Sequence, residues 1–184
     1  MDTGAESYRR YLDGDDNGIV DIIRDYKDGL TLYLCGITGN IFSAEDAMED
    51  TFFKIVTKKP RFSGKSSFKT WLYSIGRNTA IDSMRKRSRL SDSPIEDISA
   101  ADETADLERN YLKEEQKIAI HKAISALNPD YRQILHLIFF EGFSNGEAAD
   151  IMRKGKRQIE NLLYRAKSAL RSELEKEGFV YEIV

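Results

Sequence analysis

Apolar residues recur at spacings of three and four positions through most of this chain, which predicts helices rather than strands. The first helix is predicted over residues 19–37 and is expected to end at Gly39-Asn40. Its buried face would consist of Ile19, Ile22, Ile23, Tyr26, Leu30, Tyr33, Leu34 and Ile37. Because no strand pattern, repeat or low-complexity tract competes with this interpretation, we expect an all-α protein.

Two further helices are predicted in the first half of the chain. One begins at Ser43, a candidate N-cap with Asp46 three residues later, and stops at Pro60. A loop rich in glycine, serine and lysine is predicted over residues 61–67. The next helix starts at Phe68 and is expected to bury a stripe at helical spacing, made of Trp71, Leu72, Ile75 and Thr79.

The chain is predicted to divide into two small helical domains. Residues 91–111 have no helical periodicity and are dominated by Ser, Asp and Glu, so we expect a flexible acidic linker there. It would join an N-terminal domain of residues 1–90 to a C-terminal domain of residues 112–177. Residues 178–184 form a tail that either packs back, binds a partner or frays.

The predicted C-terminal domain carries clear signals for helix starts. Asn128-Pro129 has the form of an N-cap followed by proline at the first helical position. The helix that follows is expected to pack its apolar side chains inward, namely Ile134, Leu135, Ile138 and Phe139. Ser144 with Glu147 forms a capping box that opens a short helix. After a turn at residues 153–155, a longer helix is expected from residue 156 to about residue 175.

Charge is distributed unevenly, and a net charge of -3 hides two cationic segments. Residues 61–90 carry eight Lys and Arg against one Asp, and residues 153–171 carry seven against one Glu. Between them, residues 91–116 carry nine acidic side chains against two basic ones. Two separate cationic helical surfaces are typical of a protein that contacts phosphate backbones in two places.

Composition excludes several other classes of protein. At 184 residues, with 41% hydrophobic side chains, the chain can form one ordinary domain or two small ones. Cys35 is the only cysteine, so neither a disulfide framework nor a multi-cysteine metal site can form. The longest apolar run, residues 134–140, is too short to cross a bilayer, and no signal peptide is evident. We therefore expect a soluble cytoplasmic protein that inserts in no membrane and needs no cofactor.

Residues 144–171 have the proportions of a helix-turn-helix, a motif whose second helix enters the major groove of DNA. The residues expected to reach base edges stand at its N-terminal end and one turn further, namely Lys156, Arg157, Gln158 and Asn161. Arg165 and Lys167 lie farther along and are better placed for phosphates. A solvated helix with a basic outer face is the alternative, because such hairpins are common.

The basic segment 61–90 also contains Phe62, Phe68, Trp71 and Tyr73, so it could stack unpaired bases on aromatic rings while its cations follow the backbone. An ordinary core role is favoured for Phe68 and Trp71, because large aromatic side chains dominate core burial. A separate polar face is expected at the spacing of Arg77, Asn78, Asp82 and Arg85. On the preceding helix, the acidic face of Asp46, Glu49 and Asp50 suits either a basic protein surface or plain solvent.

Several motifs in one order resemble the extracytoplasmic-function branch of bacterial RNA polymerase sigma factors. They are "AEDAMEDTFFKIV", "RFSGKSSFKTWLYSIGRNTAIDSMRKRSR", an acidic linker, "ALNPDYRQILHLIFFEGFSNGEAADIM" and "QIENLLYRAKSAL". The resemblance extends from Tyr8 to Glu175 and is far more specific than the helix-turn-helix alone. It implies a protein that directs core RNA polymerase to specific promoters and helps to open the DNA.

The resemblance implies a role for each surface. The helix with Asp46, Glu49, Asp50 and Phe53 resembles the main contact with core polymerase. The loop 61–67 resembles the part that holds an extruded base of the melted −10 element, and Arg61, Ser63 and Lys65 are its polar residues. DNA contacts near the melted bases are implied for Arg77, Asn78, Asp82, Arg85 and Lys86. Contacts with the −35 element are implied for Lys156, Arg157, Gln158, Asn161 and Arg165, while Lys167 is expected to bind DNA from its position on the same helix.

The turn before the last helix departs from the family pattern, which commonly has glycine, an apolar residue and then serine or threonine. This chain has Arg153, Lys154 and Gly155 there, and a left-handed turn residue is less comfortable as arginine than as glycine. Gly155 can still serve as an N-cap. Gly146 also stands where a helix former is usual.

Two other classes of function compete with this one. An enzyme is poorly supported, since the sequence has no catalytic or metal-binding constellation and His121 and His136 fall in different helical patterns. A conventional helix-turn-helix regulator that binds duplex DNA by itself is the closer rival. The family also implies an inhibitory anti-sigma partner, which no residue here identifies.

Two substitutions test the proposed register of the last helix on promoter duplexes. Lys167→Ala should weaken binding similarly across sequences and flatten the salt dependence by about one unit, because one phosphate contact is lost. Arg157→Ala should instead relax the preference for one base pair. Affinities measured on matched and mutated duplexes over a salt series separate the two effects, and unchanged promoter choice in Arg157→Ala would show that the register is wrong.

Overall fold

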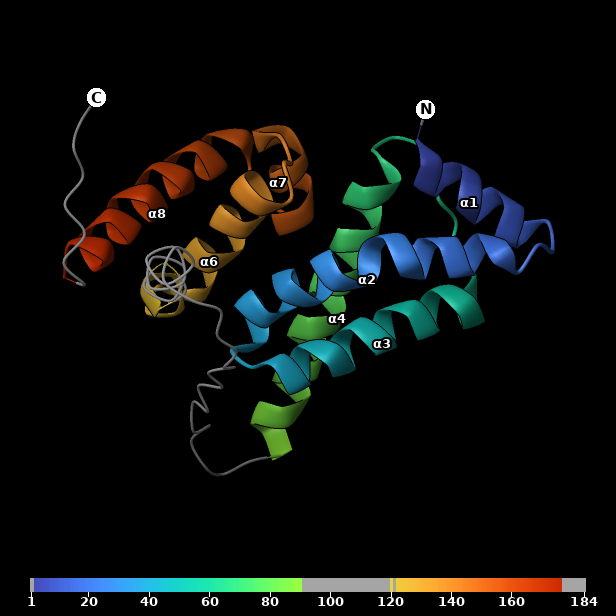
Figure 1. The fold of residues 1–184 in the computed structure, drawn as a ribbon, viewed down its shortest axis with the longest axis horizontal. Coiled ribbons are helices and arrows are strands. Elements are labelled where there is room, and N and C mark those ends of the chain that lie inside the picture. The colour runs from blue at the N-terminus through green and yellow to red at the C-terminus, as the bar shows by residue number, and fades with distance from the viewer. Residues whose placement is uncertain (1, 91–119, 121, 177–184) are drawn as a thin grey trace, which may run out of the picture.

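The computed structural model describes residues 2–90, 120 and 122–176, and these residues contain helices and short connections but no strand (Figure 1). The helices in chain order are α1 (Thr3–Leu12), α2 (Asn17–Thr38), α3 (Ile41–Lys58), α4 (Phe68–Leu90), α6 (Pro129–Leu135), the π-helix η1 (His136–Phe140), α7 (Asn145–Met152) and α8 (Lys156–Lys176). The all-α prediction is confirmed for this part of the chain. The predicted linker 91–111, residue His121 and the predicted tail 178–184 lie outside the described residues.

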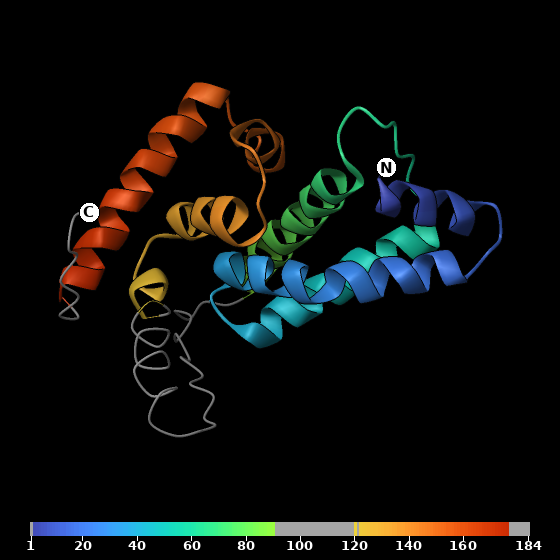
Figure 2. The same ribbon diagram turned by 45° about the horizontal axis from the view of Figure 1, so that its top comes forward.

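Helices α1–α4 form an N-terminal group in which α2 and α3 lie side by side and α4 crosses them (Figures 1 and 2). Its fully buried side chains include those of Ile22, Leu30, Tyr33, Leu34, Ile55, Phe68 and Leu72. Helix α1 was not predicted from the sequence, although Tyr8 and Tyr11 are buried against the other helices. With few apolar positions, this ten-residue helix depends on its neighbours for stability.

The boundaries of α2 and α3 bear out one prediction and correct another. Gly39, in the left-handed conformation with φ 83°, ends α2 as expected. Ser43 was expected to be the N-cap of α3, but that prediction was wrong, because Asn40 takes this place and its side chain accepts a hydrogen bond from Ser43 N at 2.8 Å. Asparagine is among the strongest N-cap residues, and the helix therefore starts a turn earlier, with Ser43 buried.

Helices α6, η1, α7 and α8 form a C-terminal group that contains the expected helix-turn-helix in α7 and α8. The side chain of Asn128 accepts from Tyr131 N at 3.0 Å at the start of α6. At the start of α7, Ser144 N donates to Glu147 Oε2 at 2.9 Å and Ser144 Oγ accepts from Glu147 N at 3.2 Å. These two predicted helix starts are therefore confirmed.

One prediction for this group fails at η1. Phe139 was expected to be packed inward, but 57% of its side chain is exposed, while Leu137 is fully buried. The sequence periodicity assumes 3.6 residues per turn, whereas a π-helix has a wider turn that rotates the following side chains. The wider turn presents Phe139 and Phe140 to solvent.

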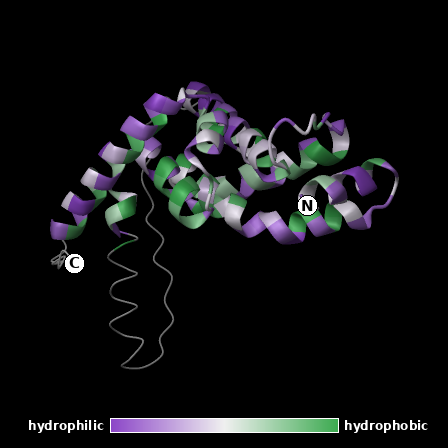
Figure 3. Ribbon diagram, turned by 90° about the horizontal axis from the view of Figure 1, so that it is seen from above, coloured by the Kyte–Doolittle hydropathy of each residue, from purple (hydrophilic) through white to green (hydrophobic). Residues whose placement is uncertain are grey.

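A single connected cluster of buried side chains runs through both groups of helices. Helix α4 packs against α7, and α2 packs against α6 and η1, so the described groups lie against each other rather than apart (Figure 1). Hydropathy colouring shows α8 at the outer edge with a predominantly hydrophilic exposed face (Figure 3). None of the helices in the described ranges is both long and apolar enough to span a bilayer.

The turn between α7 and α8 places Arg153 in the left-handed conformation, with φ 53° and ψ 46°. A side chain with a Cβ is strained there by about 1–2 kcal/mol. We therefore expect Arg153→Gly to raise the free energy of unfolding by up to about 1 kcal/mol. The gain is smaller than the strain that is relieved, because glycine has greater backbone freedom in the unfolded chain. Urea denaturation measures this change. Arg153→Ala, which keeps the Cβ, is the matched control, and an equal gain in that variant would contradict the explanation.

Candidate nucleic-acid and polymerase interfaces

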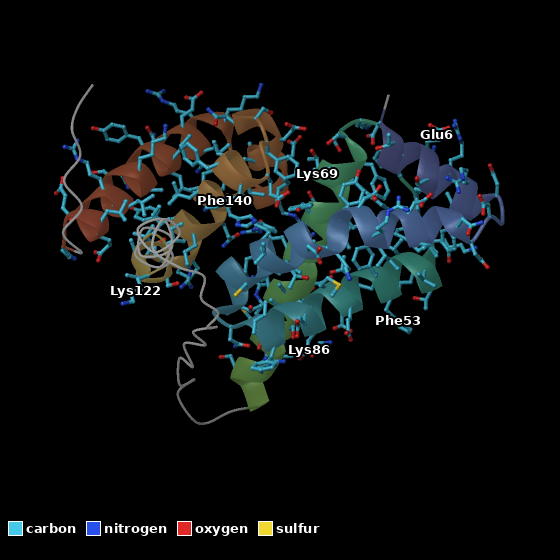
Figure 4. The ribbon with its side chains drawn as sticks, viewed as in Figure 1. Glu6, Phe53, Lys69, Lys86, Lys122 and Phe140 are labelled. Atoms are coloured by element: carbon cyan, nitrogen blue, oxygen red, sulfur yellow. The ribbon has the colours of Figure 1, made fainter. Side chains whose placement is uncertain are left out.

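The predicted polymerase-binding residues lie on the solvent side of α3. Asp46, Glu49, Asp50 and Phe53 are all exposed, whereas Phe52 is buried on the opposite side of the helix. Phe53 is the least expected of them, since 67% of this phenylalanine is exposed, and Figure 4 shows its side chain pointing away from the other helices. An exposed aromatic ring beside acidic side chains is suited to binding another protein.

Asp46 differs from its neighbours because it is already paired within the chain. Its Oδ2 lies 2.8 Å from Arg87 Nη2 of α4, and Arg87 also donates to the hydroxyl of Ser43. The pair ties the start of α3 to the last turn of α4. No ion pair of Glu49 or Asp50 occurs among the described residues, so these two carboxylates remain available to a basic partner surface.

The loop between α3 and α4 presents its polar residues to solvent. Arg61, Ser63 and Lys65 are exposed, and Gly64 takes φ 70°, which lets the loop reverse direction without a strained side chain. Phe62 is half-buried and anchors the loop, because its ring meets that of Phe68 edge-on at a centroid distance of 5.6 Å. The structure thus brings the three predicted DNA-binding residues of this loop together on one exposed surface.

The aromatic side chains of this region belong mainly to the core. Phe68 and Tyr73 are fully buried, and Trp71 is half-buried between Phe62 and Tyr8, with centroid distances of 5.4 and 5.3 Å. The favoured core interpretation is therefore confirmed for Phe68. Its ring is inaccessible to a base.

The polar face of α4 is divided between solvent and the C-terminal group. Asp82, Arg85 and Lys86 are exposed, and Figure 4 shows Lys86 on the half of α4 farther from α7. Arg77 was expected to be free for DNA, but its Nε donates to Gln133 Oε1 of α6 at 2.9 Å. Asn78, the next residue along, is half-buried.

Helix α8 carries the other predicted DNA-binding residues on one exposed side. Arg157, Asn161 and Arg165 follow one another at four-residue intervals, opposite the buried Ile159 and Ala166. Lys156, Gln158 and Lys167 are also exposed. The exposed row of Arg157, Asn161 and Arg165 can follow a groove of DNA, as the helix-turn-helix prediction requires.

Two of these side chains have partners that the sequence did not indicate. Gln158 Oε1 accepts a hydrogen bond from Gly155 N at 2.8 Å, so it caps the start of α8 and is only partly available to a base. Lys167 Nζ lies 5.2 Å from the centre of the Phe139 ring, a cation–π arrangement. Gln158 and Arg165 also line an open pocket with Lys154 and others, namely Tyr131, Asn161 and Leu162.

A polar network between the two groups of helices was missed by sequence reasoning. Lys69 Nζ of α4 lies 2.8 Å from Glu141 Oε2 and donates to the main-chain oxygen of Glu141 at 2.9 Å. Figure 4 shows Lys69 on the side of α4 that faces the C-terminal group. His136 Nε2 lies 3.4 Å from the other carboxylate oxygen, Oε1. No local pattern could have indicated this network, because Lys69 and Glu141 are 72 positions apart in the chain.

Smaller hydrogen bonds extend the same interface. The hydroxyls of Ser67 and Thr70 donate to Glu147 Oε1 at 3.3 and 3.2 Å, so the capping-box carboxylate also links α7 to the start of α4. Arg132 Nε of α6 donates to Gly36 O of α2 at 3.1 Å. Within the described residues, no group of three His, Cys, Asp or Glu is placed to hold a metal ion.

The Glu141 carboxylate remains charged in this setting. Burial by itself would raise its pKa, but the nearby polar groups of His136, Lys69 and Tyr73 outweigh burial and lower the pKa to about 2. Burial and the neighbouring Glu141 charge together raise the pKa of Tyr73 far above its usual value, so its hydroxyl stays protonated. The network therefore consists of a carboxylate surrounded by groups that can donate to it.

Two family models match this chain, Sigma-70 region 2 over residues 22–90 and Sigma-70 region 4 over residues 117–170. The chain is 30% identical over 138 residues to the RNA polymerase sigma-H factor of Pseudomonas aeruginosa, covering 69% of this chain and 70% of that protein. It is 26% identical over 157 residues to the ECF RNA polymerase sigma factor SigX of Bacillus subtilis, covering 82% of this chain and 80% of that protein.

A solved structure gives a similar result at the level of the fold. The sigma factor RpoE from Bartonella quintana, crystallised in complex with the anti-sigma factor NepR, superimposes with a TM-score of 0.70 at 27% sequence identity. The match covers 84% of this chain and 95% of that one.

The Glu141 network predicts a pH-dependent contribution to stability. Because the pKa of Glu141 is lower in the folded chain than its ordinary value of 4.5, the carboxylate stabilises the fold above that pH. This stabilisation is lost as the pH falls from about 4.5 towards about 2. We expect Glu141→Gln to lower the urea midpoint at pH 7, and we expect the difference from the wild type to shrink over that acidic range.

The matched control is Asp130→Asn, because Asp130 pairs with Lys154 at 3.0 Å within the C-terminal group and at the surface. An exposed pair contributes little, so this variant should unfold almost like the wild type. The half-buried thiol of Cys35, next to Gly36 at the interface, provides a second measurement. A thiol reagent should react faster with Cys35 in Glu141→Gln than in the wild type or in Asp130→Asn. Equal rates in all three would contradict the idea that Glu141 holds the two groups of helices together.

Proposed function

The chain belongs to the extracytoplasmic-function branch of the RNA polymerase sigma factors, and we propose how its surfaces divide the work of transcription initiation. A sigma factor is an initiation factor that directs core RNA polymerase to specific promoters and helps to open the DNA. In this proposal residues 1–90 bind core polymerase and the melted −10 element, and residues 112–177 bind the −35 duplex. The acidic segment 91–111 joins them.

One observation carries this division. Two of the exposed cationic surfaces, the loop 61–67 and the outer row of α8, lie on different groups of helices. Two such surfaces can hold two separate stretches of one promoter, whereas a single recognition helix can hold only one. The acidic, aromatic side of α3 is a third surface, of the opposite charge, and it is unsuited to DNA.

The third surface supports a contact with core polymerase. Glu49, Asp50 and Phe53 offer two carboxylates and a large exposed ring on one side of α3. An interface with one aromatic anchor and a charged rim is typical of specific protein contacts. Asp46 adds a third carboxylate to this surface while it is paired with Arg87. The same pair links α3 to α4.

The loop 61–67 and the far end of α4 support the handling of opened DNA. Arg61 and Lys65 supply positive charge, Ser63 supplies a hydroxyl, and Gly64 leaves space for a base to approach the backbone. Extruding a base costs a few kcal/mol of unstacking, which a shaped and charged loop offsets. Asn78, Asp82, Arg85 and Lys86 extend this surface along α4, and Arg77 joins it once its bond to Gln133 is broken.

The outer row of α8 supports recognition of duplex DNA. Arg157 and Asn161 are placed to reach base edges in the major groove, where arginine pairs with guanine and asparagine with adenine. Lys156, Arg165 and Lys167 are placed for phosphates, and Gln158 stabilises the start of the helix with part of its hydrogen-bonding capacity.

A helix-turn-helix regulator that acts alone is the second candidate, because the outer row of α8 is exposed in the chain by itself. It would leave the loop 61–67 and the acidic side of α3 without a role. Arg77 is bonded to Gln133 and Lys69 to Glu141, so these two cations of the N-terminal group add little to duplex binding by the chain alone, and we expect that binding to be weak until polymerase holds the chain. We place it in the cytoplasm, because that is where core polymerase works.

An inhibitory anti-sigma protein is a further proposed partner. The Bartonella quintana relative is described in complex with an anti-sigma factor, and the present chain shares its fold at a TM-score of 0.70. A protein that covers α3 or the outer row of α8 would block the surfaces proposed above.

Run-off transcription with purified core polymerase and a library of genomic fragments tests this function. We expect the chain to start transcripts at a defined set of promoters and to bind the same promoters weakly in the absence of core polymerase. Specific footprints without polymerase, or no transcripts with it, would contradict the proposal.

A variant separates polymerase binding from DNA binding in the same assay. Phe53→Ala should lower the affinity for core polymerase by at least about tenfold, since an aromatic anchor contributes about 2 kcal/mol or more. It should leave the unfolding midpoint unchanged, because the ring is mostly exposed. Phe42→Ala is the matched control, because that ring is 70% exposed near the start of the same helix.

A further inference from the structure

Helix α1 lies outside the residues matched by the family models, which begin at residue 22. It nevertheless packs closely against the rest of the N-terminal group. A Cβ on Gly4 would come within 2.5 Å of the Phe68 ring, and a Cβ on Gly18 would come within 2.3 Å of Ser7 O. The two glycines therefore allow a contact that a larger residue would prevent.

Two tyrosine hydroxyls of α1 hold the end of α3 where the loop begins. Tyr11 Oη donates to Val56 O at 3.1 Å, and Tyr8 Oη donates to Pro60 O at 2.7 Å. The oxygen of Val56 would ordinarily accept from the nitrogen four positions on, which is that of Pro60 and has no hydrogen. Tyr11 thus supplies a donor that the helix itself lacks, and Lys59 Nζ lies 4.6 Å from the centre of the Tyr11 ring.

An aspartate of the same segment holds the other end of the loop. Asp2 Oδ1 accepts from Ala5 N at 3.2 Å and caps α1, while Asp2 Oδ2 accepts from Phe68 N at 2.6 Å at the start of α4. One carboxylate therefore caps two helices. Pro60 and Phe68, which flank the loop, are both attached to the segment 2–12.

We propose that α1 is a positioning element for the loop 61–67, and that Asp2, Tyr8 and Tyr11 are the residues through which it acts. The inference rests on the proposed role of this loop in holding an extruded base. Fixing the conformation of a residue costs conformational entropy, and a loop that is ordered in advance does not lose this from its binding energy. Tyr8 and Tyr11 are buried and Asp2 bonds to the backbone, so none of the three anchors occupies the side chains of Arg61, Ser63 and Lys65, which remain exposed for the DNA strand.

Three conservative variants remove the anchors one at a time. Tyr8→Phe and Tyr11→Phe each delete one hydroxyl and keep the ring. Asp2→Asn leaves one acceptor oxygen for two backbone donors, Ala5 N and Phe68 N, so one carboxylate can no longer cap both helices. Two controls match them chemically: Tyr33→Phe removes a buried hydroxyl for which the described residues offer no hydrogen-bond partner, and Asp13→Asn changes an exposed carboxylate at the far end of α1.

The first measurement is amide hydrogen exchange of residues 61–67 in the full chain. We expect faster exchange of this loop in the three variants and wild-type rates in the two controls. Unchanged exchange in all three variants would overturn the claim that α1 orders the loop.

The second measurement uses holoenzyme and a fluorescent single-stranded oligonucleotide with the non-template −10 sequence of a promoter recovered by run-off transcription. Each variant should lose about fivefold in affinity, as expected for one lost hydrogen bond of about 1 kcal/mol, with unchanged affinity for core polymerase and for −35 duplex. Faster loop exchange with unchanged single-strand affinity would overturn the proposal. Equal losses for all three ligands would also overturn it, because they would indicate a general loss of folding.

Failure of the proposed function has a different signature. A wild-type holoenzyme that binds no single strand and starts no transcript contradicts the role of the loop. The exchange measurement then still decides, on its own, whether α1 sets the conformation of that loop.

Discussion

The contact between the carboxylate of Glu141 and the ammonium of Lys69 is the interaction on which the arrangement of this molecule depends. Only 12% of the Glu141 side chain is exposed, and a carboxylate in that setting is costly unless charged and polar partners surround it. Lys69 and Tyr73 come from one group of helices and His136 from the other, so the carboxylate is satisfied only when the groups are packed together. Gly29 makes room, because a Cβ there would come within 2.8 Å of the carboxylate.

This packing determines which of the functional surfaces are accessible. The interface covers Arg77 and Lys69 but leaves the loop 61–67, the outer row of α8 and the acidic side of α3 exposed. The Nε of Arg77 is held by Gln133 Oε1, and the ammonium of Lys69 by Glu141. These two cationic side chains therefore stabilise the packing of the two groups of helices in the chain alone.

Local chemistry explains which predictions were confirmed. Asn128, Ser144 and Glu147 act on backbone groups three residues away, so their capping roles follow directly from spacing. Ser43 failed as an N-cap because the helix starts three residues earlier, at Asn40, whose side chain accepts from Ser43 N. Phe139 failed as a core residue because η1 departs from the 3.6-residue period that the prediction assumed. The left-handed Arg153 was foreseeable from the departure of its turn from the family pattern.

The sequence by itself determined the helical class, most helix boundaries, the two cationic segments and the family, since each depends on residue type and on spacing within a few turns. Only the tertiary structure decided which charged side chains are free, because Arg77, Lys69 and Glu141 meet partners more than fifty positions away. The tertiary structure also determined the position of α1, whose tyrosine hydroxyls and Asp2 carboxylate form hydrogen bonds with backbone atoms that flank the loop 61–67. Local spacing along the chain does not predict these long-range contacts, because the energy of a buried charge or of an unpaired carbonyl depends on which groups the fold places beside it.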